Sequence, residues 1–176
     1  MQPVNLLRTT LEQIADSDHY LFSVRDFWSL FPEFTIENLR MLISRAAKTG
    51  ILEHVCKGIY IYPKINYDSS LVLFKVASKL RANNFNYVSL ETVLTQEGMI
   101  LQQLMGWITV MTTGRSGTID CGQFGTVEMI HTAKPQNKII QHLRLDTHTG
   151  MWWADSELAL QDMKSAKRNM DLIEIS

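Results

Sequence analysis

Apolar residues recur every three or four positions through much of the first 50 residues, the spacing that lines one face of an α-helix. This pattern predicts a helix from Pro3 through Ala15, with the proline in the first turn, where its missing N–H is tolerated. A second, shorter helix should run to about Leu30 and end at Phe31-Pro32, because a residue that precedes proline avoids helical angles. A third helix should cover residues 36–48.

Residue types at the ends of these segments support the predicted boundaries. Ser23 followed by Asp26 is a capping-box pattern at the start of the second helix. Thr35 is a candidate N-cap for the third helix, and Gly50 follows that helix at the position where a positive φ is common. The outward face of the third helix should then hold Glu37, Met41, Ser44, Arg45 and Lys48, with Arg40 on its flank.

Two runs rich in strand-forming residues follow the third helix. Residues 51–56 and 59–62 are separated by Lys57-Gly58, which has the composition of a two-residue hairpin turn. Residues 20–22 form a further short extended segment between the first two helices. The order of helices, turn, helix and hairpin predicts a winged helix-turn-helix over residues 1–63, whose third helix has the dimensions to enter a major groove.

After a linker at residues 63–68, the pattern predicts a mixed α+β domain over residues 69–176. Its first helix should be capped by Asp68 or Ser69, and a second short helix should be capped by Ser89 and end at Gly98. Strands are expected at residues 107–112, 126–131, 139–145 and 151–153. A last helix should open at Asp155 and direct four residues largely outward: Asp162, Lys164, Lys167 and Arg168. The predicted fold class is α+β, a small sheet flanked by helices following the winged helix.

Composition limits the classes of protein to which the chain can belong. Its 176 residues are 45% hydrophobic and 20% charged, which is typical of globular domains and excludes wholly disordered or fibrous chains. No apolar run reaches the length of a membrane span, and no secretion signal is evident, so we expect a cytoplasmic protein without membrane partners. Cys56 and Cys121 lie far apart in sequence, which favours reduced, buried thiols.

The net charge of −1 is not that of a typical nucleic-acid binder, so charge placement matters more than the total. Residues 1–63 hold six Lys/Arg and seven Asp/Glu, a net of −1, whereas residues 35–58 hold four Lys/Arg against two Asp/Glu, a net of +2. Such charges also occur on solvated helix faces, and winged helices also dock proteins. The local cationic excess on helix and hairpin favours DNA contact through five candidates: Arg40, Ser44, Arg45, Lys48 and Lys57.

A second group of cations lies in the α+β domain. Its members are Lys75, Lys79, Arg81 and Arg115. The first three should lie on the exposed side of a helix, where a solvated surface is the simpler interpretation. The alternative is a second patch that follows DNA phosphates.

Motifs for catalysis or cofactor binding are weak. The segment Gly114–Gly117 lacks the spacing of a phosphate-binding loop and is better interpreted as a hairpin loop with an exposed Arg115, followed by a strand. The five histidines do not show metal-ligand spacing, and no nucleophile elbow or paired acidic motif is found. We therefore expect no catalytic residues, no metal and no cofactor. An enzyme that binds a nucleotide near Arg115 is the least supported interpretation.

Several segments together resemble the AbiEi family of abortive-infection antitoxins from type IV toxin–antitoxin systems. In the first domain these are Phe22–Phe27, Leu39–Leu52 and Lys57–Tyr60, and in the second they are Tyr87–Leu94, Ile108–Gly117 and Ala154–Asp162. Each motif is weak alone, but they occur in the order of the family across nearly the whole chain.

This resemblance implies a bacterial antitoxin that represses its own operon through the winged helix and counteracts a nucleotidyltransferase-like toxin, usually without a stable complex. By position, Arg40, Ser44 and Arg45 would contact base edges, while Lys48 and Lys57 would contact phosphates. Two copies of the chain, which could form a homodimer on DNA, would read an inverted-repeat operator. Two alternatives stay open: a protein-interaction module that sequesters a toxin directly, and a winged-helix regulator without antitoxin activity.

Overall fold

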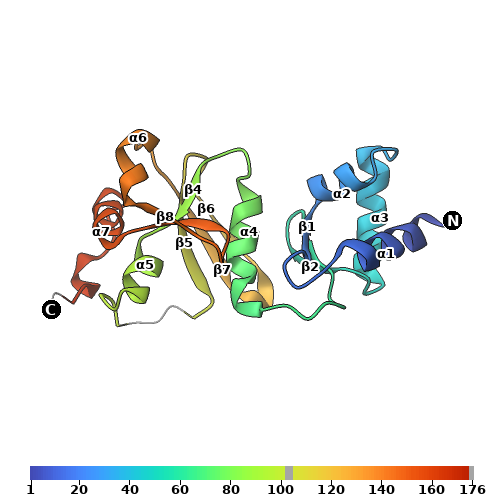
Figure 1. Ribbon diagram of the computed structural model, residues 1–176, viewed down its shortest axis with the longest axis horizontal. Coiled ribbons are helices and arrows are strands. Elements are labelled where there is room, and N and C mark those ends of the chain that lie inside the picture. Colours follow the sequence, from blue (N-terminus) through green and yellow to red (C-terminus); the bar gives the residue numbers. More distant parts are fainter. Residues whose placement is uncertain (102–104, 175–176) are drawn as a thin grey trace. The chain divides into compact units, whose positions relative to one another are not determined.

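The computed structural model describes residues 1–101 and 105–174, and it divides the chain into two compact units. The first unit comprises Met1–Ser70 and the second Leu71–Ser176 (Figure 1). The fold is α+β, as predicted. Within the described ranges, no helix is both long enough and apolar enough to span a bilayer.

The first unit has the element order of a winged helix-turn-helix. Its elements are α1 (Pro3–Ile14), β1 (Leu21–Ser23), α2 (Val24–Leu30), α3 (Ile36–Lys48), β2 (Glu53–Cys56) and β3 (Ile59–Ile61). The strands form an antiparallel sheet in the order β1-β3-β2, so the hairpin strand β3 lies between β2 and the strand that precedes α2. The predicted bounds of α3 agree with the structure.

The helix ends of this unit follow the predicted caps. The Ser23 hydroxyl accepts a hydrogen bond from the Asp26 N–H, and the Asp26 carboxylate accepts one from the Ser23 N–H at 2.7 Å. The Thr35 hydroxyl accepts a hydrogen bond from the Asn38 N–H at 3.3 Å. Gly50 has φ +78° just beyond α3, which a residue with a Cβ would rarely adopt. These local signals account for the agreement between predicted and observed helices.

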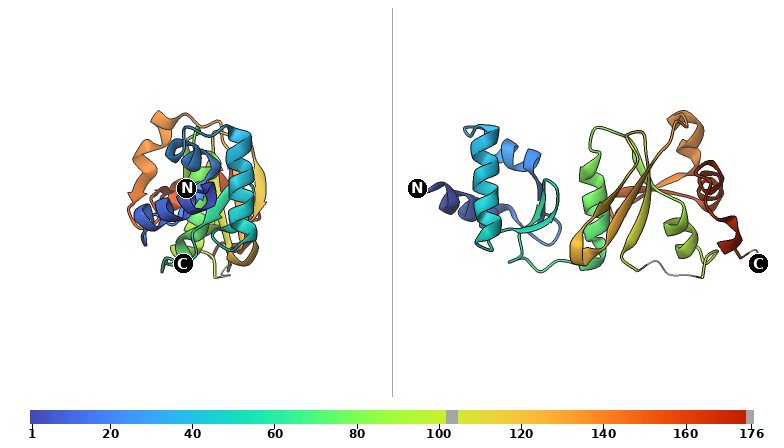
Figure 2. Two further views of the ribbon diagram at one scale, coloured as in Figure 1. Left: turned by 90° about the vertical axis from the view of Figure 1, so that its right-hand side faces the viewer. Right: turned by 180° about the vertical axis from the view of Figure 1, so that it is seen from behind.

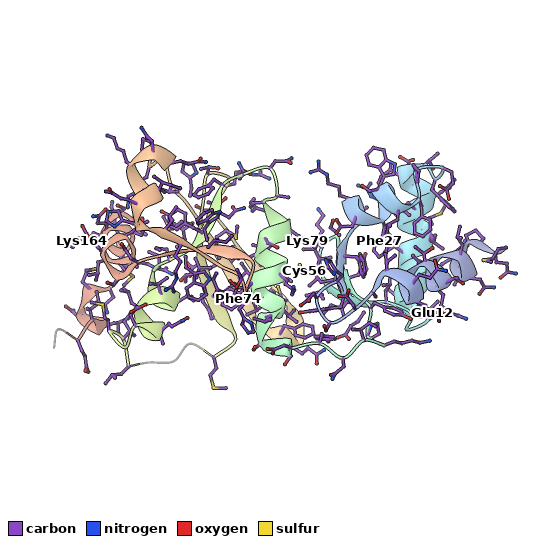
Figure 3. All side chains as sticks on the ribbon, viewed as in Figure 1. Glu12, Phe27, Cys56, Phe74, Lys79 and Lys164 are labelled. Carbon is purple, nitrogen blue, oxygen red and sulfur yellow. The ribbon has the colours of Figure 1, made fainter. Side chains whose placement is uncertain are left out.

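Burial explains why the three helices and the hairpin stay together. Leu7 and Leu11 of α1, Phe27 of α2 and Leu39 of α3 are fully buried in one apolar cluster. Figure 3 shows Phe27 among the helices of this unit. Its ring contacts that of Phe22 with centroids 5.5 Å apart, which joins α2 to β1. The core therefore fixes α3 by one face and leaves its other face to solvent.

The second unit is built on a six-stranded mixed sheet in the order β6-β7-β5-β4-β9-β8. The strands are β4 (Asn86–Val88), β5 (Trp107–Thr112), β6 (Gly117–Asp120), β7 (Thr126–His131), β8 (Leu143–Asp146) and β9 (Met151–Ala154). The helices are α4 (Val72–Leu80), α5 (Glu91–Gln96), α6 (Gln136–Ile139) and α7 (Ser156–Ser165). Figures 1 and 2 show α4 on one face of the sheet and α5 and α7 on the other. Because both faces are covered, five consecutive residues of β5 from Ile108 are buried.

Three local predictions about strands, turns and caps of the second unit are wrong. Residues 139–145 do not form one strand, because Pro135 starts the short helix α6, a 3₁₀ turn follows at Ile140–His142, and only then does β8 begin. Gly114–Gly117 is not a hairpin loop, because β7 lies between β5 and β6. Ser89 does not cap α5: Leu90 is its N-cap, with φ +59° and no side-chain cap.

The predicted cap of α4 is also displaced. The N-cap of α4 is Leu71, and its side chain makes no capping bond. Asp68 instead accepts a hydrogen bond from the Ser70 N–H at 2.9 Å, at the start of the 3₁₀ turn Ser69–Leu71. A polar cap is therefore present, but it begins the 3₁₀ turn and not the α-helix.

The outward orientation predicted for Asp162 is wrong. This carboxylate, on α7, is fully buried, and it accepts hydrogen bonds from the Ser89 hydroxyl at 2.6 Å and the Tyr87 hydroxyl at 3.0 Å. It also forms an ion pair with Lys134. Burial raises the pKa of the Tyr87 hydroxyl, and the nearby Asp162 carboxylate raises it further. Asp162 therefore ties α7 to strand β4.

Arg168 is likewise partly buried and not directed into solvent. Its guanidinium lies 2.9 Å from the Glu91 carboxylate of α5, and it also pairs with the Glu128 carboxylate of β7. Trp107 of β5 donates a hydrogen bond to the same Glu128 at 3.1 Å. Arg168 thus joins the segment after α7 to α5 and the sheet. Lys164 is exposed on α7, as predicted (Figure 3).

Candidate nucleic-acid interface

The exposed face of α3 carries four of the five predicted DNA-contacting residues. Arg40, Ser44, Arg45 and Lys48 are all exposed, and Met41 between them keeps 52% of its surface. With about 3.6 residues per turn, these five positions fall on one side of the helix. The buried positions, Leu39, Leu42, Ile43 and Ala46, occupy the opposite side. The structure therefore brings Arg40, Ser44, Arg45 and Lys48 together on one face.

The turn between α2 and α3 holds this face outward. Phe31 ends α2 and is buried, and its ring meets Phe34 edge-on with centroids 6.0 Å apart. A backbone hydrogen bond also joins these two residues: the Phe34 N–H donates to the Phe31 carbonyl at 3.1 Å. A rigid aromatic turn at this point fixes where α3 begins and which side of it faces the core.

The cations on this face have no carboxylate partners within residues 1–101 and 105–174. Arg40, Arg45 and Lys48 form no ion pair there, and neither does Lys57 on the β2–β3 hairpin. Glu37 is exposed one turn before Arg40 and Met41 on the same face, and it lowers the positive potential there. The face therefore combines three cations with one acid.

Lys57 lies on a hairpin tip that packs against the start of α2 and does not project from the unit as a free wing. It is exposed at the tip of the β2–β3 hairpin, but the next residue, Gly58, accepts a hydrogen bond from the Val24 N–H at 3.0 Å. The pairing Ser23↔Ile59 continues to the end of β1, so the tip lies against the start of α2. Lys48 ends α3 four residues before β2 begins, whereas Lys57 directly follows the last residue of β2, a strand about 13 Å long.

Sequence reasoning missed two features beside the cationic face. His54 is exposed on β2, and its ring meets that of Tyr60 on β3 with centroids 5.3 Å apart. A groove of about 370 Å³ runs between the start of α1 and the exposed face of α3, and it is lined by Gln2, Pro3, Val4, Phe34, Asn38, Met41, Leu42 and Arg45. The cross-strand pair follows from the register of the hairpin, whereas the groove depends on how α1 packs on α3.

The structure brings together only part of the second cationic group. The Arg81 Nε donates a hydrogen bond to the Arg115 carbonyl at 3.4 Å, so these two residues meet although 34 positions separate them. Arg115 is exposed and Arg81 is half-buried. Lys75 and Lys79 lie one turn apart on α4 and are also half-buried. This group is more enclosed than the cations on α3.

A second polar group lies in the α+β unit, at His142 and Asp155. His142 Nδ1 lies 2.7 Å from an Asp155 carboxylate oxygen, beside a cavity of about 260 Å³. Hydrogen bonding to Asp155 raises the pKa of His142. In the described part of the chain, the other ring nitrogen contacts only the Gln141 amide nitrogen, at 3.4 Å, so no nucleophile is aligned with it. No cluster of three or more His, Cys, Asp or Glu suited to a metal ion occurs among the residues described.

Comparisons with known proteins add no relative: no protein-family model matches this sequence, and no curated protein matches it significantly. The residues of α3 and of the β2–β3 hairpin are therefore the basis on which a function can be assigned.

Proposed function

We propose that this protein is a sequence-specific DNA-binding repressor that uses α3 as its recognition helix. The observation that carries the proposal is the exposed face of α3, on which Arg40, Arg45 and Lys48 form no ion pair within the described residues. Three cations that the fold leaves without carboxylate partners are suited to phosphates and guanine edges. The helix-turn-helix around them presents such a helix to a major groove.

Each side chain has a role suited to its chemistry. Arg40 and Arg45 offer planar guanidinium groups that bond the O6 and N7 atoms of guanine in pairs, and the Ser44 hydroxyl bonds either kind of base edge. Lys48, at the end of α3, and Lys57, at the hairpin tip, serve as phosphate contacts. The start of α1 borders the same groove as Arg45, so the positive end of that helix adds to this surface.

So few cations imply modest affinity for one copy of the chain. Each phosphate contact contributes a salt-dependent increment, and four cations support only a small number of them. Two copies on an inverted repeat double the contacts, with half-sites about 34–36 Å apart or a multiple of that distance. We therefore propose that the repressor acts as a pair of copies on its operator.

We further propose that the protein is the antitoxin of a bacterial toxin–antitoxin system and acts in the cytoplasm. The support is the resemblance of six segments, spread over both units, to the AbiEi antitoxins. The second unit would counteract a nucleotidyltransferase-like toxin while the first represses the operon that encodes both proteins. Co-expression with the neighbouring gene tests this role: rescue of growth supports it, and unrelieved toxicity contradicts it.

The test of DNA binding starts from duplexes selected from random sequence by the full-length protein. Affinity is then measured by fluorescence anisotropy for Arg40→Ala, Arg45→Ala and the matched control Arg8→Ala, an exposed arginine on α1. Each α3 variant should lose about 1–3 kcal/mol of binding free energy, while the control should change little. Far-UV circular dichroism verifies folding. Equal affinity of all three variants and the unsubstituted protein would overturn the assignment.

A further inference from the structure

Among the strands that the structure describes, β8 is the last at one end of the sheet of the second unit. Among the described strands, β8 pairs only with β9. Arg144 and Leu145 are exposed, and Leu145 keeps 49% of its surface. An uncovered edge offers backbone N–H and C=O groups for pairing with another strand.

The hydrogen-bond pattern identifies which backbone groups face outward. The Asp155 N–H donates to the His142 carbonyl at 2.8 Å, so these residues form a hydrogen-bonded pair that continues the β8–β9 register. Bonded and non-bonded pairs alternate along an antiparallel ladder. The N–H and C=O groups of Leu143 and Leu145 therefore point away from β9. The Leu143 N–H donates to the Ile140 carbonyl of the preceding 3₁₀ turn, whereas within the described residues no group bonds the N–H and C=O of Leu145.

The charge pattern of β8 is complementary to that of a second, antiparallel β8. Arg144 and Asp146 are two positions apart, so their side chains lie on the same face of the strand. Asp146 is held in place because its carboxylate accepts hydrogen bonds from the Thr149 N–H at 2.8 Å and the Thr149 hydroxyl at 2.7 Å. When a strand with this pattern pairs with a reversed copy of itself, unlike charges come opposite one another.

We propose that β8 pairs antiparallel with β8 of a second copy of the chain, about a two-fold axis that passes beside Leu145. In this register Leu145 lies opposite its own counterpart, and the two residues exchange both backbone hydrogen bonds. Arg144 lies opposite Asp146 of the second copy, and the reverse pair follows from the symmetry. The six-stranded sheet becomes one half of a continuous twelve-stranded sheet.

The neighbouring two-fold registers are disfavoured by charge. A shift of the axis by one residue toward the N-terminus sets Arg144 opposite Arg144, and a shift in the other direction sets Asp146 opposite Asp146. Like charges directly opposite each other destabilise an antiparallel pair. Of these three registers, the one centred on Leu145 is therefore favoured. The proposal deepens the proposed function, which needs two copies on DNA, but the pairing itself needs no DNA.

The first test measures the mass of the full-length protein by sedimentation equilibrium without DNA over a wide range of concentration. The unsubstituted chain should approach twice 20.2 kDa as concentration rises. Leu145→Pro removes an N–H that points outward and makes no bond to β9, and proline is tolerated on edge strands. This variant should stay folded by circular dichroism and stay at the monomer mass.

Charge variants test the register. Arg144→Glu sets two carboxylates opposite each other and should abolish the dimer, whereas Arg144→Lys keeps the sign and should preserve it. Lys164→Glu makes the same charge change at an exposed position on α7 and should leave the dimer intact. Because all these measurements omit DNA, failure of dimerisation and failure of DNA binding are separate results.

Crosslinking gives the most direct readout. Residues that form a hydrogen-bonded antiparallel pair have Cα atoms about 5.5 Å apart, within the range of a disulfide. Leu145→Cys should therefore crosslink to itself under mild oxidation, while Leu143→Cys, which would lie opposite Thr147, should not. A monomer at every concentration would overturn the proposal. So would a dimer that persists in folded Leu145→Pro and Arg144→Glu proteins, because such a dimer uses another surface.

Discussion

The Asp162 carboxylate and the Ser89 hydroxyl lie 2.6 Å apart in the interior of the second unit. Asp162 belongs to α7 and has no exposed surface, and Ser89 follows the strand β4. A charge removed from water destabilises a fold unless hydrogen bonds and an opposite charge compensate it. Here Tyr87 and Lys134 supply the remaining partners, so Asp162 is a centre of the contacts between helix and sheet.

The first prediction concerns this centre. Asp162→Asn leaves Lys134 without its counter-charge, and we expect it to lower the free energy of unfolding of the second unit by about 3–5 kcal/mol. Tyr87→Phe removes one hydrogen bond and should cost about 1 kcal/mol. Urea titration followed by tryptophan fluorescence measures both, since three of the four tryptophans, Trp107, Trp152 and Trp153, belong to this unit.

The matched control for this prediction is Asp171→Asn, which neutralises an exposed carboxylate later in the same unit. Its unfolding midpoint should stay near that of the unsubstituted protein. Equal stability of Asp162→Asn and the control would mean that the buried carboxylate contributes nothing, contrary to the expectation.

The second prediction concerns the pH dependence of stability at His142. Hydrogen bonding to Asp155 raises the pKa of this imidazole in the folded protein above its ordinary value near 6.5. The folded state therefore binds the proton more tightly than the unfolded state. The resulting stabilisation is fully present below about pH 6.5 and is lost as pH rises through the pKa of the folded state.

Substitution of this histidine tests the sign. The free energy of unfolding of the unsubstituted protein should exceed that of His142→Gln by more at about pH 5.5 than at about pH 8.5. Urea titrations at the two pH values measure the difference. His148→Gln provides the control, because this exposed histidine lies on the nearby turn between β8 and β9. A difference that grows toward high pH would refute the assigned direction.

The third prediction concerns Glu37, the acid on the exposed face of α3. Glu37→Gln removes a negative charge from the surface proposed to face phosphates, so affinity for DNA should rise by about 0.5–1 kcal/mol in low salt. The gain should shrink as salt increases, because exposed charges are screened. Glu12→Gln is the control: it removes an exposed carboxylate of α1, which pairs with Lys64 at 3.9 Å. An equal gain in both variants would indicate an effect of net charge alone.

The first unit could be predicted closely because its signals are local. The bounds of α3 follow from apolar spacing within 13 residues, and its caps, Thr35 and Gly50, are adjacent in sequence. The exposed face of α3 follows from the same periodicity. The position of Lys57 could not be predicted this way, because the contact of Gly58 with Val24 joins residues 34 positions apart.

The second unit was predicted less well because its decisive contacts are between distant residues. Asp162 is buried through Ser89 and Tyr87, which precede it by 73 and 75 positions. A polar residue on a weakly amphipathic helix is assigned to solvent unless such partners are known. The order of the strands is a similar case, since no local feature indicates that β7 pairs in parallel with β5 and separates it from β6.

The last prediction concerns Met41, which lies on the exposed face of α3 near Arg40, Ser44 and Arg45 with 52% of its surface exposed. An apolar side chain there is suited to the thymine methyl group, which only A·T pairs present in the major groove. Replacing thymine by uracil in the selected duplex removes that methyl and nothing else. At the position that Met41 reads, we expect binding to weaken by about 0.8 kcal/mol, roughly fourfold.

The same base change should have little effect on Met41→Ala, whose side chain no longer reaches the methyl group, and fluorescence anisotropy of the four combinations gives the coupling energy. Arg45→Ala serves as the comparison, because its loss of affinity should be the same with thymine and uracil. Equal effects of uracil on the unsubstituted protein and on Met41→Ala would remove Met41 from the recognition surface while leaving the arginine contacts to be judged on their own.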